Sequence, residues 1–245
     1  MTGWLEELGA ALLPSGLNHL GVVSRARYDA AAPPAFAAER LHAGTRAVVV
    51  LGSGGRAHWE QFLAYVAEDP IARLARTPDP LDDFCASLFA RWVPLTAGCR
   101  VIFPTAGAPA GFDFMRLAEL AGLGAPSELG TLVSERFGPW LGLRAAIYTP
   151  RDLEDSPPAR RLCDGCAAPC RAACPVGAVA ASFDWRRCVD ERLRPGSGCR
   201  ARCISRSACI VAPEEAYDEL EITYHYDRNE GRRRLCARFG VADLC

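Results

Sequence analysis

Lysine is missing from this 245-residue sequence, whose 28 basic residues are therefore all arginines. That bias is typical of a GC-rich genome and indicates no function. Basic and acidic residues nearly balance at a formal net charge of -1, which argues against a general nucleic-acid or membrane-surface binder. No stretch approaches the roughly 18 unbroken apolar residues of a membrane span, and the start of the chain carries acids where a secretory signal carries bases. We therefore expect a cytoplasmic protein that binds neither DNA nor a membrane.

Cysteine, in contrast, is abundant and unevenly placed. Cys85 and Cys99 lie in the first half of the chain, whereas the other ten of the twelve cysteines lie between Cys163 and Cys245. Disulfides are rare in the cytosol, so metal binding or redox chemistry explains these thiols better. The asymmetry divides the chain into a body, a cysteine-rich module and a helical tail, at residues 1–155, 156–212 and 213–245.

The body alternates helical and strand patterns. Apolar residues at helical spacing predict helices at 4–13, 58–69, 80–93 and 113–122. Apolar runs, several of them rich in β-branched residues, predict strands at 17–23, 46–52, 99–104 and 143–150. Such alternation favours an α/β sandwich around a central sheet, with the 46–52 strand buried on both faces. Two further helical patterns, at 213–228 and 232–245, are expected to pack back on the body.

The segment CDGCAAPCRAACPVGA (163–178) has the spacing C-x2-C-x3-C-x3-C-P. The bacterial iron–sulfur run is C-x2-C-x2-C-x3-C-P, one residue shorter in the middle gap, and its fourth cysteine binds the other cluster in two-cluster ferredoxins. A cubane needs thiolates from several directions, so three ligands come from one tight loop and the fourth comes from elsewhere. Eight thiols, the number that two 4Fe-4S clusters need, are present: Cys163, Cys166, Cys170, Cys174, Cys188, Cys199, Cys203 and Cys209.

Other interpretations of these thiols remain open. A structural zinc site usually shows two C-x2-C pairs about 15–20 residues apart, and this chain has one such pair. A single cluster, with the later cysteines merely buried, also fits their irregular spacing. Cys236 and Cys245 lie beyond the motif and are not expected to bind iron.

Three segments resemble the epoxyqueuosine reductase family, which joins a cobalamin-binding α/β domain to a two-cluster ferredoxin module. They are AELAGLGAPSELGTLVSERFGPWLGLRAAIYT, CDGCAAPCRAACPVGAV and FDWRRCVD. The resemblance implies an α+β sandwich with a flavin-reductase-like central sheet and a C-terminal two-cluster ferredoxin-like module, a body also shared by reductive dehalogenases and the human cobalamin-processing protein. It further implies that Cys163, Cys166, Cys170 and Cys209 bind one cluster, and that Cys174, Cys188, Cys199 and Cys203 bind the other.

The chain also departs from that family. Its second cysteine group, CRARCISRSACIV, has wider gaps and no proline, and VIFPTAGAP lacks the acid that the family carries before the AGLG helix. The HEAT-like repeats that help longer relatives to bind tRNA are not present in the sequence. The resemblance therefore implies that this chain has the electron-transfer half of the family's function. It implies neither the tRNA substrate nor the proton donor.

Candidate cofactor and catalytic residues cluster around GAPSELGTL (124–132). Glycines there allow close approach to the backbone and hydroxyls can donate to a corrin amide, so the predicted cofactor contacts are Gly122, Gly124, Ser127, Gly130 and Thr131. The alternative is a helix cap at Ser127 with a turn at Gly130. Asp113 and Glu128 are the nearest carboxylates and are candidate proton donors if burial raises their pKa; the alternative is that both are ordinary solvated carboxylates.

These features predict a cobalamin-dependent iron–sulfur reductase in which the clusters pass electrons to cobalt, giving Co(I). Its expected partners are a redox donor protein of flavodoxin or ferredoxin type and a small-molecule or RNA-nucleoside substrate. Flavin in place of cobalamin is the less favoured cofactor. The alternative function is that of a ferredoxin-type electron carrier, or of a corrinoid-handling protein, without catalytic turnover.

Overall fold

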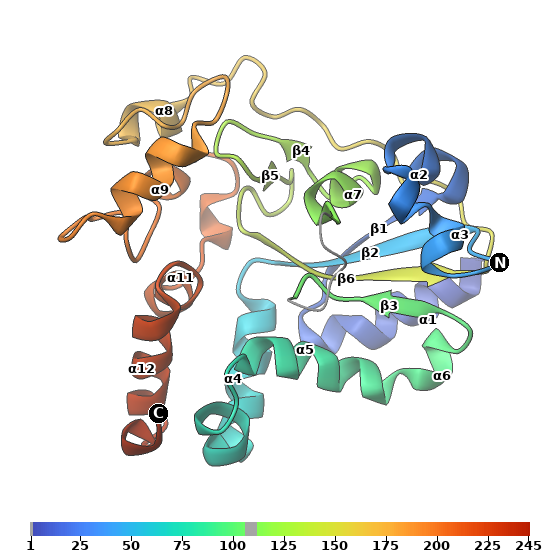
Figure 1. Ribbon diagram of the computed structural model, residues 1–245, viewed down its shortest axis with the longest axis horizontal. Coiled ribbons are helices and arrows are strands. Elements are labelled where there is room, and N and C mark those ends of the chain that lie inside the picture. The colour runs from blue at the N-terminus through green and yellow to red at the C-terminus, as the bar shows by residue number, and fades with distance from the viewer. Residues whose placement is uncertain (1, 106–111) are drawn as a thin grey trace.

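A four-stranded antiparallel sheet forms the centre of the body in the computed structural model, which describes residues 2–105 and 112–245 (Figure 1). The strand order is β1–β2–β6–β3, so the first two strands are neighbours and β6 joins them to β3. The strands are β1 His19–Ser24, β2 Ala47–Gly54, β3 Arg100–Ile102 and β6 Leu141–Thr149. All four lie where the apolar runs predict them. Their antiparallel pairing makes the body an α+β sandwich.

β2 is buried along its whole length because both faces of the sheet are covered. Successive side chains of a strand point to opposite faces, so Val49 and Leu51 enter one apolar core while Val48 and Val50 enter the other. The predicted burial of the 46–52 strand on both faces is therefore confirmed.

Helices cover each face of the sheet, as Figure 1 shows. One face packs against α1 Thr2–Leu12, α4 Ala57–Glu68 and α5 Pro80–Arg91. The other packs against α2 Arg25–Ala31, α3 Ala38–Leu41 and α7 Phe114–Leu120. Short elements connect these: α6 Val93–Thr96, the 3-10 turns η1 Leu13–Ser15 and η2 Pro34–Phe36, and the π-helical turn η3 Ile71–Ala75. The four helices predicted in the body are present.

A two-stranded hairpin projects from the body toward the cysteine-rich module. It consists of β4 Ala125–Pro126 and β5 Leu132–Val133. The extended segment 151–161 then leads into the module and is tied to β1, since Val22 and Ser156 exchange backbone and side-chain hydrogen bonds. The module itself holds only short helices, α8 Pro169–Ala173, α9 Trp185–Leu193 and α10 Ile204–Ser207.

The tail returns to the body, as predicted. It consists of α11 Glu219–Tyr226 and α12 Arg228–Arg238, flanked by the 3-10 turns η4 Pro213–Glu215 and η5 Ala242–Leu244. The ring of Tyr224 lies 5.2 Å from that of Trp59 on α4, and Leu235 is fully buried in the same core. No helix in the described part of the chain is both long and apolar enough to cross a membrane.

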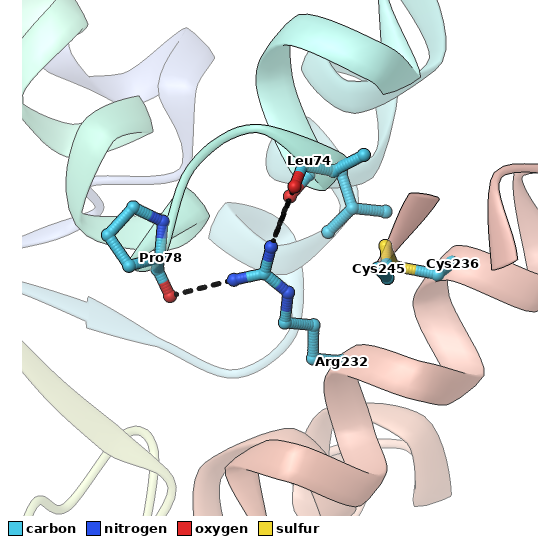
Figure 2. Close-up of a disulfide and its surroundings, with 6 residues drawn as sticks. Leu74, Pro78, Arg232, Cys236 and Cys245 are labelled. Atoms are coloured by element: carbon cyan, nitrogen blue, oxygen red, sulfur yellow. Dashed lines mark hydrogen bonds between the residues drawn. A yellow bond between two sulfur atoms is a disulfide. The ribbon is translucent and has the colours of Figure 1, made fainter. Parts of the chain in front are cut away.

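Cys236 and Cys245 form a disulfide that closes the end of the tail (Figure 2). Beside it, Arg232 donates hydrogen bonds to the carbonyl oxygens of Leu74 and Pro78, each at 3.1 Å, which fastens α12 to the body. The expectation that the cysteines are not joined in disulfides is therefore wrong for this pair. The two residues lie nine positions apart on the folded-back end of a helix, a proximity that the sequence does not display. The other ten cysteines are free thiols.

Candidate functional site

Four thiols of the module surround one pocket against the body hairpin. Cys163 and Cys166 come from the loop before α8, Cys170 from α8 itself, and Cys209 from the segment after α10. The hairpin closes the pocket through its turn and its second strand, with Ser127, Glu128, Leu129 and Val133. Cys209 is more than thirty positions from its neighbours in the sequence, and it reaches them because α10 packs on α8.

Four other thiols line a second pocket of about 230 Å³ on the far side of α8 and α10. They are Cys174, Cys188, Cys199 and Cys203. Apolar side chains complete the wall, among them Val179 and Phe183, and Leu129 of the hairpin lines both pockets. The two sets of thiols are the two sets that the family resemblance implies, while iron binding itself stays a prediction.

In both pockets, burial and the closeness of the thiols to one another shift the pKa values of the cysteines. Burial raises the pKa values of Cys163, Cys170, Cys188 and Cys199, and the neighbouring cysteines of the same set raise them further. Cys174 differs, because backbone N–H groups of Val179, Val176 and Ala178 outweigh the effect of burial and lower its pKa. Thiolates gathered in this way repel one another unless a cation lies between them.

Backbone amides point at three of the sulfur atoms. The N–H of Ala168 donates to Cys166 at 3.4 Å, that of Ala178 to Cys174 at 3.2 Å, and that of Arg206 to Cys203 at 3.3 Å. Hydrogen bonds to ligand sulfurs are one of the means by which proteins set the potential of an iron–sulfur cluster. Within the described residues, no group of three or more His, Cys, Asp or Glu side chains is arranged to hold a single metal ion.

Arg206 fixes the helix that carries thiols to both pockets. Its guanidinium donates to the carbonyl of Pro139 at 2.6 and 3.1 Å, and it lies over the rings of Trp140 and Tyr217. One side chain thus ties α10, between Cys203 and Cys209, to the body and to the start of the tail. Arg206 is a positioning residue that no sequence motif marks.

The predicted proton donors occupy two different settings. Glu128 pairs with Arg171 of α8, and this guanidinium lowers the pKa of Glu128, which keeps it ionised and makes it a poor proton donor. The pair also holds the module against the hairpin. Asp113 accepts a hydrogen bond from the Arg116 amide at 2.9 Å and so caps α7. The structure does not bring Asp113 to either cysteine pocket.

The three glycines among the predicted cofactor contacts pack closely against other parts of the chain. A Cβ atom at Gly122 would overlap Pro157, and one at Gly130 would overlap Phe183. A Cβ atom at Gly124 would press against strand β5 of the hairpin. The Ser127 hydroxyl donates to the Thr131 carbonyl at 2.7 Å within the hairpin turn. Ser127 therefore begins a β-turn rather than a helix, and the predicted turn at Gly130 is present. Ser127 and Gly130 also line the first and the second thiol pocket, and the cofactor contacts of the five residues stay a prediction.

A buried carboxyl group that the sequence analysis missed lies between the tail and the sheet. Glu221 of α11 is 2% exposed, and its Oε2 has no hydrogen-bond partner within the described residues. Burial raises the pKa of Glu221 to about 8, against the opposing effect of Arg144. Its Oε1 lies 3.9 Å from the ring nitrogen of His225. Only the packing of α11 on the body buries this residue, so no motif signals it.

No family model and no curated protein matches the sequence. Solved structures do match, and the first is an epoxyqueuosine reductase from Bacillus subtilis, 13% identical, with a TM-score of 0.59 over 99% of this chain and 83% of that one. The chain has the fold of the epoxyqueuosine reductases. The resemblance stated from the cysteine motifs is thereby confirmed for the fold.

Two other kinds of protein share the same architecture. The B12-trafficking protein CblC of C. elegans is 13% identical, with a TM-score of 0.58 over 96% of this chain and 97% of that one. A reductive dehalogenase is 14% identical, with a TM-score of 0.50 over 95% of this chain and 36% of that one. At such identities the comparisons establish the fold and leave the chemistry to the residues of this chain.

Proposed function

We propose that this chain is an iron–sulfur oxidoreductase that holds two 4Fe-4S clusters in its module and passes electrons toward the α+β body. The observation that carries the proposal is the sorting of eight thiols into two pockets of four. The fold supports it, because reductases with this fold are among the similar structures.

The donor set fits the proposed clusters. Each pocket offers four thiols, and four cysteines are the usual ligand set of a 4Fe-4S cluster. A cubane spreads its ligands around a core of several atoms, so its thiols are spaced more widely than those around a single ion. Bound clusters supply one-electron transfer. The residues of the chain hold the thiols in place through Arg206 and Arg171, and they donate backbone N–H groups to the sulfurs.

Cobalamin is the acceptor that the similar folds favour, since one of them is described as a B12-trafficking protein and another as a B12-dependent dehalogenase. Gly122, Gly124, Ser127, Gly130 and Thr131 are the residues proposed to contact it, and we assign no step to it. A small-molecule or RNA-nucleoside substrate is part of the same proposal. An epoxyqueuosine reductase bound to a modified tRNA stem loop is among the similar structures. The redox donor is proposed to be a protein of flavodoxin or ferredoxin type.

The iron content tests the clusters. We expect anaerobically purified or reconstituted protein to carry about eight iron and eight acid-labile sulfide atoms per chain, because each cubane holds four of each. Iron and sulfide are measured colorimetrically against protein determined by amino-acid analysis. About four iron atoms would leave one cluster, and stoichiometric zinc without sulfide would contradict the proposal.

A cobalamin titration separates a ferredoxin-type electron carrier from a cobalamin-dependent reductase or a corrinoid-handling protein. We expect the cluster-loaded protein to bind cob(II)alamin with micromolar affinity and to change its absorption and paramagnetic spectra, because the similar folds include B12 proteins. Flavin mononucleotide serves as the matched second ligand. If neither ligand binds while the clusters are present, the chain is a ferredoxin-type electron carrier.

A further inference from the structure

Helix α9 carries a stripe of apolar side chains on the surface of the module. Trp185, Val189 and Leu193 follow one another at intervals of four residues, and residues at this spacing share one face of a helix. They are exposed by 60%, 40% and 74%. Contiguous apolar side chains on a protein surface are typical of binding sites.

The stripe borders the second thiol pocket. Cys188 lies on the same helix, directly before Val189, and its thiol lines that pocket. A protein seated on the stripe would therefore lie within one helix width of the proposed cluster. Electron transfer between proteins needs such an approach, and the hairpin of the body reaches this pocket only from another side, through Leu129 and Gly130.

Arginines surround the stripe. Arg186 lies over the ring of Trp185 at 5.3 Å, and Arg192, Arg200 and Arg228 line a surface groove together with Val189 and Leu193. No carboxylate of the described residues lies within ion-pair distance of Arg186 or Arg192. The module as a whole has ten arginines and four carboxylates, although the complete chain has a net charge of -1. Arg200 and Arg228 pair with Asp227 and Asp79, so Arg186 and Arg192 are the positive charges beside the stripe that lack an ion-pair partner among the described residues.

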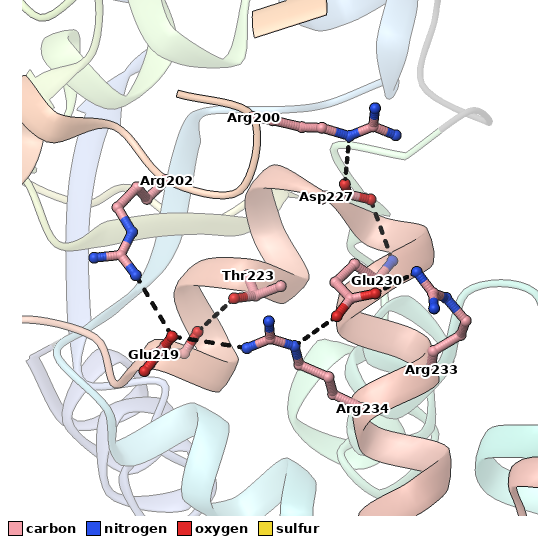
Figure 3. A network of polar contacts seen from close by, with 8 residues as sticks. All are labelled: Arg200, Arg202, Glu219, Thr223, Asp227, Glu230, Arg233 and Arg234. Atoms are coloured by element: carbon pink, nitrogen blue, oxygen red, sulfur yellow. Dashed lines mark hydrogen bonds and ion pairs between the residues drawn. The ribbon is translucent and has the colours of Figure 1, made fainter. Parts of the chain in front are cut away.

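Ion pairs join the loop after α9 to the tail beside the groove. Figure 3 shows Arg200 of the module paired with Asp227 at 2.8 Å, and Arg202 paired with Glu219 at 3.5 Å. These contacts join the loop around Cys199 to the tail helices. Arg192 of α9 also donates a hydrogen bond to the Tyr226 carbonyl at 2.7 Å, so both sides of the groove are held together and a partner would meet a preformed surface.

We propose that the α9 stripe and its surrounding arginines, the α9 face, are the docking surface for a small acidic electron-donor protein of the flavodoxin or ferredoxin type. This inference rests on the proposed function. The apolar stripe supplies the water-excluding centre of an interface with Trp185 as its anchor, and Arg186 and Arg192 attract an acidic rim. RNA phosphates would engage the arginines but would leave the stripe uncovered, so a protein partner is favoured. Cys188 and the three thiols that share its pocket would hold the cluster that accepts one electron from the reduced donor, and no proton or bond would be transferred.

Two surface variants test the docking. Trp185→Ala removes the anchor and Arg186→Glu reverses a charge, and we expect each to weaken binding of a reduced flavodoxin by about tenfold or more. Binding is measured by calorimetric titration, and cluster reduction by stopped-flow absorbance. Reduction by dithionite, which needs no docking, is expected to be unchanged in both variants. The matched controls are Leu13→Ala and Arg40→Glu, an exposed apolar side chain and an exposed arginine of the body.

The outcomes separate this inference from the function on which it rests. If both variants bind the donor and are reduced by it as fast as the unaltered protein, the α9 face is not the docking surface, even with iron present. If the variants lose affinity for a tRNA stem loop but not for the donor, the surface binds RNA and the inference is overturned. If donor binding depends on Trp185 and Arg186 in protein that takes up no iron, docking stands and the cluster proposal falls.

Discussion

Replacing Cys188 by alanine is expected to halve the iron content, from about eight to about four atoms per chain. The reason is that Cys188 shares its pocket with three other thiols, and a cubane that lacks one of its four ligands is readily lost. Cys163→Ala is expected to remove the other half, because Cys163 lines the other pocket. Iron, sulfide and the low-temperature paramagnetic spectrum of the reduced protein measure both losses.

Double variants make this result specific. Cys188→Ala combined with Cys199→Ala removes two thiols of one pocket and should lose no more iron than either alone, whereas Cys188→Ala with Cys163→Ala should lose nearly all of it. Cys85→Ala is the control, since Cys85 is buried near His58 at the other end of the body. Full iron in Cys188→Ala, or equal losses in both double variants, would refute the division of the thiols between two clusters.

The second large effect is expected in the pH dependence of stability. Glu221 has a folded-state pKa of about 8, above the 4.5 of an ordinary glutamic acid. Below about pH 4.5 both states hold the proton, so Glu221 does not alter stability there. Between about pH 4.5 and 8 the unfolded chain releases the proton and the folded protein retains it, so the free energy of unfolding falls as the pH rises. The slope is at most about 1.4 kcal/mol per pH unit.

Glu221→Gln is expected to remove this slope, because an amide cannot ionise. The variant should equal the unaltered protein near pH 4.5 and exceed its stability at pH 8 by a few kcal/mol. Urea unfolding at half-unit intervals from pH 5 to 8 measures the difference. Glu214→Gln, at an exposed position close to α11, should keep the unaltered profile. Parallel profiles for Glu221→Gln and the unaltered protein would show that Glu221 is ionised in the folded state, as Arg144, Arg206 and Arg56 favour.

Local patterns predicted the elements of the body well. The run AVVVL in β2 has a side chain for each core on alternate residues, and this composition suits only a strand with both faces covered. The hairpin at 125–133 was harder to predict. Its strands are two residues long, and Ser127 suits both a helix cap and a β-turn, so only the pairing of Ala125 with Val133 selects the turn.

The candidate site also combines features that the local sequence predicts with features that depend on tertiary contacts. The spacing of Cys163, Cys166, Cys170 and Cys174 is a local property, and it identifies an iron–sulfur motif without knowledge of the fold. The disulfide of Cys236 and Cys245, by contrast, depends on how the chain folds back after α12. The role of Arg206 depends likewise on three segments that meet only in space.

The sequence by itself determined the strands and helices of the body, the concentration of thiols in the module and their iron–sulfur spacing, because these properties depend on residues within one or two turns of each other. Only the tertiary structure decided that the eight thiols line two separate pockets, that Glu221 is buried, and that the stripe on α9 is left uncovered. Those properties depend on contacts between segments far apart in the chain, and the free energy of such contacts is set by packing rather than by local preference.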